Sequence, residues 1–321
     1  MEITLRRIVI LALAMYPLLT FSQATPWPIK PIRVIVPNTA GGATDIVARQ
    51  VMERISQQLG QPIIVEDRPG AGGTIGSSVV AHAEPDGYTL MVISNGHTLV
   101  PSLYRNLNYD PVKDFIGVIP LASVPMVLVM SPAKGIRNLQ ELVKSAKANP
   151  GSLNYASSGG ATQLGAERLR LAAGYTGTHI PFKGSPEALT DVMAGRVDFY
   201  YSPIGLAKPF FASDKLIPIA VSSARRSSGL PDVPTSIEAG LPKSDYEVWI
   251  GLFAPAKTPP AIIARLHAET AKALRNPEIR DKFSAMVLDG MSMSSAEFEL
   301  FLKKDFELNG ELAKAAGIAV N

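Results

Sequence analysis

The chain has 321 residues, of which 46% are apolar and 18% charged, so its composition excludes a disordered protein and its length favours two domains. It contains no cysteine, which excludes disulfides, cysteine-bound zinc, iron–sulfur clusters and thiol nucleophiles. The 31 basic and 28 acidic residues leave a net charge of +3, without the basic stripe that nucleic-acid binding needs, so no nucleic-acid partner is expected.

The first 24 residues have the pattern of a secretory signal peptide. Arg6 and Arg7 precede the apolar run 8–20, which is short for a membrane span. Ser22 and Ala24 supply small residues at positions −3 and −1 of a cleavage site. We therefore expect cleavage after Ala24 and a soluble periplasmic protein, with an uncleaved membrane anchor as the less favoured alternative. Without cysteine, no lipid can be attached at a lipoprotein-type site.

The rest of the chain alternates apolar β-type runs with helical patterns, which predicts an α/β protein. Its first part repeats a strand–loop–helix unit, with glycine-rich turns where the strands end. Strands are predicted over 32–36, 63–65 and 88–93. Helices are predicted from about Thr44 to Gly60 and after the turn 69–73.

The same alternation continues to the C-terminus. Strands are predicted over 125–130, 155–156, 197–201, 216–222 and 248–253, and helices from Asn138, Ser185, Pro259 (closed by Pro277) and Ser294. No linker rich in Ser, Pro or charge separates two halves. We therefore expect two α/β lobes between which the chain crosses more than once, with a ligand cleft at the carboxyl ends of the strands.

The loop 37–45 joins a predicted strand to a predicted helix and is the most informative segment. Gly41 and Gly42 let backbone N–H groups approach a ligand closely, and the helix N-terminus adds partial positive charge, which suits an anion such as a carboxylate. Thr39 and Thr44 add hydroxyl donors. Asp45 lies in the first helical turn, where it is favourable without a ligand; a role in orienting the loop or a ligand amine is an equal alternative.

The segment 157–162 repeats this combination of hydroxyls and glycines at a strand-to-helix turn. One such loop is weak evidence, but one in each lobe favours a ligand held between opposed helix N-termini. The turn 68–76 is different, because Ile75 stands where a GxGxxG motif needs its last glycine; we assign it a mainly structural role.

Motifs for catalysis or metal binding are absent from the sequence: there is no HExxH, GxSxG or GxxxxGK[ST]. The four histidines are isolated and lack metal-ligand spacing, so we predict no metal site, no cofactor and no enzyme. His97 is interpreted as a loop histidine rather than a cleft residue, and His179 as a structural residue in a strand. Lys183 follows a strand end, where an exposed lysine is favoured over an anion-binding one.

Many short strings, in this order, resemble the Bug family, the periplasmic solute-binding components of tripartite tricarboxylate transporters, also called the TctC family. The resemblance covers essentially the whole chain. Its landmarks include Trp27-Pro28-Ile29-Lys30-Pro31, Val36-Pro37 through Gly41-Gly42, Arg68-Pro69-Gly70-Ala71-Gly72-Gly73, Asp86-Gly87-Tyr88, Asn154-Tyr155-Ala156-Ser157, Phe182-Lys183-Gly184 and Leu230-Pro231-Asp232-Val233-Pro234-Thr235.

The resemblance implies a Venus-flytrap fold of the type II-like class: two Rossmann-like lobes with a central cleft and two crossovers. By analogy the first lobe is 25–124 plus 247–321 and the second is 125–246. The resemblance also implies a monomer that captures a small carboxylate or related metabolite and presents it to membrane permease subunits. The implied ligand-binding residues are Thr39, Ala40, Gly41, Gly42, Ala43, Thr44, Asp45, Asn95, Thr98, Ser157, Ser158, Gly159, Gly160, Ala161 and Thr162.

Two departures from the family pattern bear on ligand preference, which the sequence leaves open. Asn38 stands where the family often has Phe or Tyr, and the loop starting at Ser157 is shorter and lacks a histidine found in relatives. Two other functions stay as alternatives. One is a ligand-sensing subunit for a membrane receptor, which would need the same cleft. The other, less favoured because of the misplaced glycines, is a secreted α/β enzyme such as a dehydrogenase.

Overall fold

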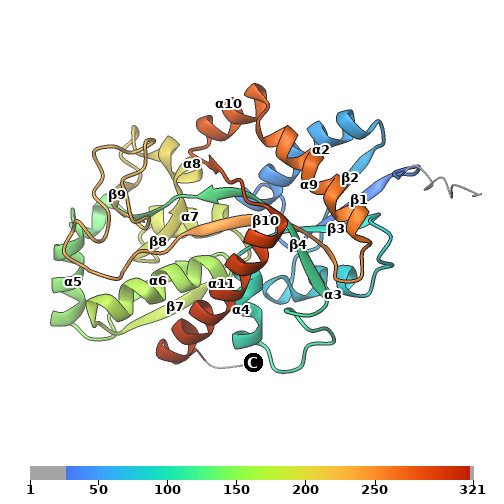
Figure 1. The fold of residues 1–321 in the computed structure, drawn as a ribbon. Coiled ribbons are helices and arrows are strands. Elements are labelled where there is room, and N and C mark those ends of the chain that lie inside the picture. Colours follow the sequence, from blue (N-terminus) through green and yellow to red (C-terminus); the bar gives the residue numbers. More distant parts are fainter. Residues whose placement is uncertain (1–26, 319–321) are drawn as a thin grey trace, which may run out of the picture.

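The computed structural model describes residues 27–318, so the predicted signal peptide lies outside the described residues. Within this range no helix combines the length and apolar character of a membrane span. The described chain forms two sheets flanked by helices, and each sheet is the centre of one lobe (Figure 1).

The first lobe contains a mixed six-stranded sheet in the order β11-β4-β10-β3-β1-β2. Strand β1 pairs in parallel with β2 and β3, whereas β10 runs antiparallel to β3 and β4. The strands of this sheet are β1 (Ile32–Val36), β2 (Ile63–Asp67), β3 (Thr89–Ser94), β4 (Phe115–Val124), β10 (Val248–Pro255) and β11 (Asp289–Gly290).

The second lobe contains a five-stranded sheet in the order β7-β6-β8-β5-β9. Its strands are β5 (Met126–Met130), β6 (Leu153–Ser157), β7 (Gly177–Pro181), β8 (Phe199–Pro203) and β9 (Ile217–Val221). Strands β5 and β8, like β10 of the first sheet, are buried along their whole length, as expected for strands covered on both faces.

Helices fill most connections between the strands. They are α2 (Ala43–Leu59), α3 (Thr74–Ala81), α4 (Gly96–Leu103), α5 (Leu139–Ala148), α6 (Gly160–Ala173), α7 (Ser185–Met193), α8 (Ile204–Ala207), α9 (Pro260–Leu274), α10 (Pro277–Ala285) and α11 (Ser295–Ala315). Helix α2 buries Val47, Val51 and Ile55 at four-residue spacing and ends at Gly60, which takes the left-handed conformation that favours glycine.

The chain passes between the sheets twice. It leaves β4 for β5 through Pro125 and returns into β10, and the two passages are joined by a hydrogen bond of 2.5 Å from Ser123 Oγ to Glu247 Oε1. Helix α11 packs on β4 and α4 of the first lobe and also on α6 of the second. Because α11 contacts both lobes, the residue boundaries 124/125 and 246/247 stay a prediction.

The structure differs from the sequence-based expectations at three places. Strand β4 was not predicted; it contains Pro120, which the sheet accommodates opposite Gly251, beside a register shift in β10. Helix α4 replaces the loop expected after Ser94. Pro277 does not simply end a helix but opens α10, which Asn276 caps.

Candidate ligand-binding site

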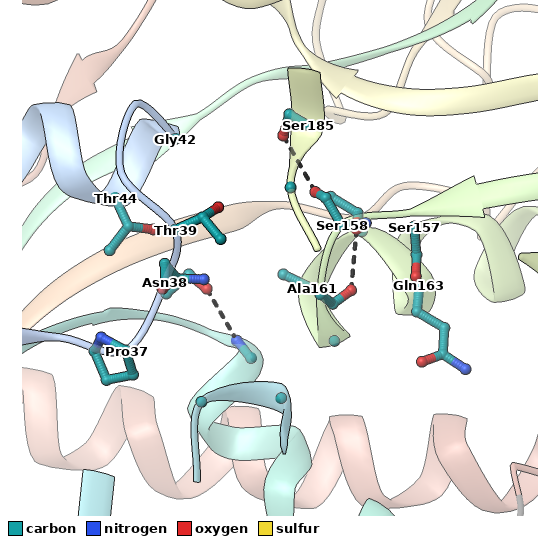
Figure 2. A pocket seen from close by; sticks show the side chains of 18 of the residues that line it. Pro37, Asn38, Thr39, Gly42, Thr44, Ser157, Ser158, Ala161, Gln163 and Ser185 are labelled. Carbon is teal, nitrogen blue, oxygen red and sulfur yellow. Dashed lines mark hydrogen bonds between the residues drawn. The ribbon is translucent and has the colours of Figure 1, made fainter. Parts of the chain in front are cut away.

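A cavity of about 730 Å³ lies between the two lobes, where strands of both sheets end. From the first lobe it is lined by the loops that follow β1, β2 and β3, and from the second by the loops that follow β6 and β7. Apolar side chains beside the two crossovers complete the wall: Val124, Met126, Val248 and Ile250. Figure 2 shows the two principal loops facing each other, with Thr39 and Thr44 opposite Ser157 and Ser158.

The loop after β1 contributes only part of the predicted set. Thr39, Gly42, Ala43 and Thr44 line the cavity. Ala40 and Gly41 are exposed and lie outside the lining, so the structure does not bring them to the ligand space. Thr39 also crosses the cleft, where its Oγ1 donates to the Lys183 carbonyl at 3.3 Å.

Asp45 orients this loop instead of lining the cavity. Its Oδ2 accepts the Gly41 backbone N–H at 2.8 Å, and its Oδ1 forms an ion pair of 2.6 Å with Arg49. The carboxylate is 5% exposed. Of the roles open from sequence, the orientation of the loop is the one this geometry supports.

The loop after β6 brings its whole predicted set, 157–162, to the cavity. Thr162 closes it in the way that Asp45 closes the first loop: its Oγ1 accepts the Ser158 N–H at 2.8 Å and donates to the Gly159 carbonyl at 3.0 Å. Gly159 has φ +150°, a backbone conformation that other residues rarely adopt. In both loops, a side chain accepts a hydrogen bond from the backbone N–H group four residues before it and thereby holds the loop.

A third loop, after β7, lines the same cavity and was not predicted as a binding loop. Lys183, Gly184 and Ser185 belong to it, and the Lys183 N–H donates to Glu187 at 3.3 Å, again four residues downstream. Helix α7 begins one residue earlier than expected, with Gly184 and not Ser185 as its N-cap. The signal for this site was present in the strand-like run followed by Gly-Ser-Pro.

Several helix N-termini border this cavity, and three of them belong to the loops 39–44, 157–162 and 183–185. Helices α2, α6 and α7 start after Gly42, Gly159 and Gly184, and none of these N-caps has a side-chain hydrogen bond. The first N–H groups of a helix have no partner within the helix, and they carry its partial positive charge. The arrangement can hold an anion through backbone donors.

The electrostatics of the lining favour the same ligand charge. Among the described residues, no Asp, Glu or Arg lines the cavity, and Lys183 is its one permanently charged side chain. His179 also lines it, stacked on Tyr155 and 2.6 Å from Ser157 Oγ. Burial lowers the pKa of His179, which favours the neutral form of the imidazole.

Asn95 and Thr98 lie beneath the cavity and outside its lining. Both are essentially unexposed, and their side chains donate hydrogen bonds within the protein, whereas Asn95 Oδ1 has no partner among the described residues. Asn95 Nδ2 donates to Tyr246 Oη at 2.9 Å, and Thr98 Oγ1 donates to Asp305 at 2.6 Å. The reason is helix α4, which turns the expected loop inward. We therefore leave both residues out of the proposed site.

His97 lies on α4 as well and is neither a loop nor a cleft residue. Its ring packs among Phe115, Phe253 and Phe306, and burial lowers its pKa to about 4. The turn 68–76, expected to be mainly structural, also lines the cavity through residues 69–73. Its structural role is visible at Gly76, where a Cβ atom would lie 2.8 Å from the Arg68 carbonyl oxygen.

This architecture, two α/β lobes enclosing a cavity beside two crossovers, is that of a periplasmic solute-binding protein. The periplasmic binding protein BugD superposes with a TM-score of 0.85 at 31% identity, over 92% of this chain and 100% of that one. Rpa4515 of R. palustris, solved with adipate, gives 0.87 at 30% identity over 92% and 100%. MatC of Rhodopseudomonas palustris, solved with malate, gives 0.83 at 31% identity over 89% and 100%.

The family model TctC, described as "Tripartite tricarboxylate transporter family receptor", matches residues 47–318, and the chain belongs to this family. The predicted resemblance and the predicted two-lobed α/β fold are thereby confirmed. The family and these structural neighbours are solute-binding proteins, so the alternative of a secreted enzyme is set aside.

Proposed function

We propose that this protein captures a small carboxylate in the periplasm and presents it to the permease of a tripartite tricarboxylate transporter. The observation that carries the proposal is the set of three helix N-termini without side-chain caps around a cavity that has no acidic lining among the described residues. Adipate and malate, the ligands of two neighbours, are both dicarboxylates, which supports the same class.

The ligand would bind between the loops 39–44, 157–162 and 183–185. Hydrogen bonds from N–H groups to a carboxylate are charge-assisted and stronger than neutral ones. The apolar side chains beside the crossovers would cover the hydrocarbon part of the ligand. Closure would bring the lobes together about the two crossovers, and Thr39 already bonds across the cleft.

The test is calorimetry and thermal unfolding with mono- and dicarboxylates and their matched primary amides. A carboxylate at 100 times its Kd is expected to stabilise the protein by about 2.7 kcal/mol, whereas the uncharged amide of the same shape should give almost none of this. Binding of the amides as tightly as the acids, or of neither, would contradict the proposal.

Delivery to a permease needs its own experiment, since a sensor subunit would use the same cleft. We expect the full-length chain, expressed in its native host, to lose its N-terminal segment and to be recovered in the periplasmic fraction. Crosslinking in the presence of the ligand should capture permease subunits. Capture of a sensor kinase in their place would support the sensing alternative and contradict this part of the proposal.

A further inference from the structure

Most hydroxyl groups in the cavity wall are already engaged within the protein. Ser157 bonds to His179, Ser158 to Tyr200 at 2.6 Å, and Ser185 to the same Tyr200 at 2.8 Å. The remaining bonded hydroxyls are those of Thr39, Ser94 and Thr162. Groups of this kind shape the wall, but they have limited freedom to select one ligand over another.

Asn38 is different. Of the described side chains that line the cavity, only that of Asn38 has a buried polar atom without a hydrogen-bond partner, its Oδ1. It lies in the loop after β1, between Pro37 and Thr39, across the open space from Ala161 (Figure 2). Its Oδ1 is buried in the structure, but no hydrogen bond to a described residue holds the carboxamide. The group can therefore turn to bring either its oxygen or its NH₂ group to a ligand.

We propose that Asn38 is a specificity-determining residue and that the physiological ligand is a hydroxy acid, whose hydroxyl donates to the Asn38 oxygen. This inference rests on the proposed function, since it adds a second group to the carboxylate. A buried acceptor left without a donor is unfavourable, so a ligand that supplies the donor gains affinity over one that does not.

Two other ligand groups fit this position less well. A second carboxylate is ionised at pH 7 and can only accept from the Asn38 NH₂ group, which leaves Oδ1 without a donor. An ammonium group has donors but carries positive charge toward the N-termini of α2, α6 and α7, and no described Asp or Glu in the lining offsets it. A hydroxyl is a neutral donor and can also accept from the Asn38 NH₂ group.

The experiment measures Kd by calorimetry for sets of acids that differ in one group: succinate, malate and aspartate; adipate and 3-hydroxyadipate; phenylacetate and mandelate. Wild type is compared with Asn38→Leu, which keeps the side-chain volume but removes the carboxamide. The matched control is Asn149→Leu, the same change at an exposed residue outside the cavity. Circular dichroism and thermal unfolding check that each variant is folded. If Asn38→Leu does not fold, Asn38→Ala takes its place in the comparison.

In at least one set, wild type and Asn149→Leu should bind the hydroxylated acid about tenfold or more tighter than its unsubstituted partner. Asn38→Leu should bring the two values within about twofold by weakening the hydroxylated acid alone. Equal affinities within every set in wild type, a preference that survives Asn38→Leu, or a preference for aspartate would overturn the inference while leaving the carboxylate proposal intact. Failure of every acid to bind would overturn both.

Discussion

The helix N-termini that face the cavity differ from those on the outside of the protein. Helices α5, α10 and α11 begin after Asn138, Asn276 and Ser294, and each of these side chains accepts a backbone N–H of its own first turn. Helices α2, α6 and α7 begin after glycines that supply no such acceptor. Outer helix α9 lacks a cap too, but it begins at Pro260, which has no N–H group.

The difference separates two uses of the same backbone groups. A side-chain cap stabilises a helix by about 1 kcal/mol because it satisfies one of the unpaired N–H groups. Helices α5, α10 and α11 have this stabilisation, whereas α2, α6 and α7, which begin at the cavity, do not. Backbone donors left free beside a cavity are suited to an anionic ligand.

Giving a cavity helix the cap of an outer helix should have the largest effect. Gly42 has φ −77° and ψ 164°, an ordinary N-cap conformation, and a Cβ atom there would meet its nearest neighbour at 3.4 Å. We expect Gly42→Asp to fold and to weaken carboxylate binding by about 100-fold, because the new carboxylate takes the N–H groups and repels the ligand. Calorimetry gives Kd, and thermal unfolding checks the fold.

Two controls separate the causes of that loss. Gly42→Ser supplies a neutral cap and should weaken binding by about tenfold. Asn149→Asp adds the same charge on the outer surface and should leave Kd unchanged. If Gly42→Asp binds within threefold of wild type, the N-terminus of α2 is not the anion site.

The buried side of α11 offers the next largest effect, on stability. Asp305 accepts hydrogen bonds from Thr98 at 2.6 Å, Asn309 at 3.0 Å and Trp249 at 3.2 Å. Burial nevertheless raises its pKa from 3.8 to about 6. The folded state thus binds a proton more tightly than the unfolded state, so the stability from this group is complete below pH 4 and is lost as pH rises through 6.

We therefore expect Asp305→Asn to be more stable than wild type at pH 8 by about 2–3 kcal/mol, with the difference disappearing toward pH 4. Urea unfolding across this pH range measures it. An equal difference at every pH would show that the substitution acts through packing and not through ionisation of Asp305.

A substitution in the second-lobe loop 157–162 should have a smaller effect on both carboxylate affinity and the free energy of unfolding. Thr162→Val keeps the shape of the side chain but removes the acceptor for the Ser158 N–H and the donor to the Gly159 carbonyl. We expect carboxylate binding to weaken by about tenfold and the free energy of unfolding to fall by about 1 kcal/mol. Thr178→Val, at an exposed residue of β7 in the same lobe, should change neither. Unchanged affinity in Thr162→Val would mean that the loop keeps its shape without this bond.

The sequence predicted the elements whose signals are local. The four-residue spacing of Val47, Val51 and Ile55 with Gly60 after it matches α2, because amphipathic spacing and a glycine stop need no knowledge of the rest of the fold. The segment 157–162 was also predicted from a local signal, because hydroxyls and glycines between a strand and a helix indicate a strand-to-helix turn. The structure places this segment on the cavity wall.

What the sequence did not predict depends on tertiary context. Pro120 argues against a strand until Gly251 and a register shift in β10 are known to lie opposite it. Helix α4 contains Gly96 and Pro101, which weaken its helical signal, so Asn95 and Thr98 were expected in a loop. The loop 183–185 joins the site because β7 pairs in parallel with β6, and strand order is not visible in a single sequence.

Removal of an outer cap should have the smallest effect and leave binding untouched. At α11, Ser294 Oγ accepts the Glu297 N–H at 3.3 Å, and the Glu297 carboxylate accepts the Ser294 N–H at 2.8 Å, which forms a capping box. Ser294→Ala should lower the free energy of unfolding by about 1 kcal/mol. Because no residue at the start of α11 lines the cavity, the same protein should bind its carboxylate with unchanged Kd. Urea unfolding and calorimetry on one preparation measure the change in stability and the Kd. A change in Kd would show that the N-terminus of α11 is coupled to the cleft. Outer and cavity helix ends would then not serve separate purposes.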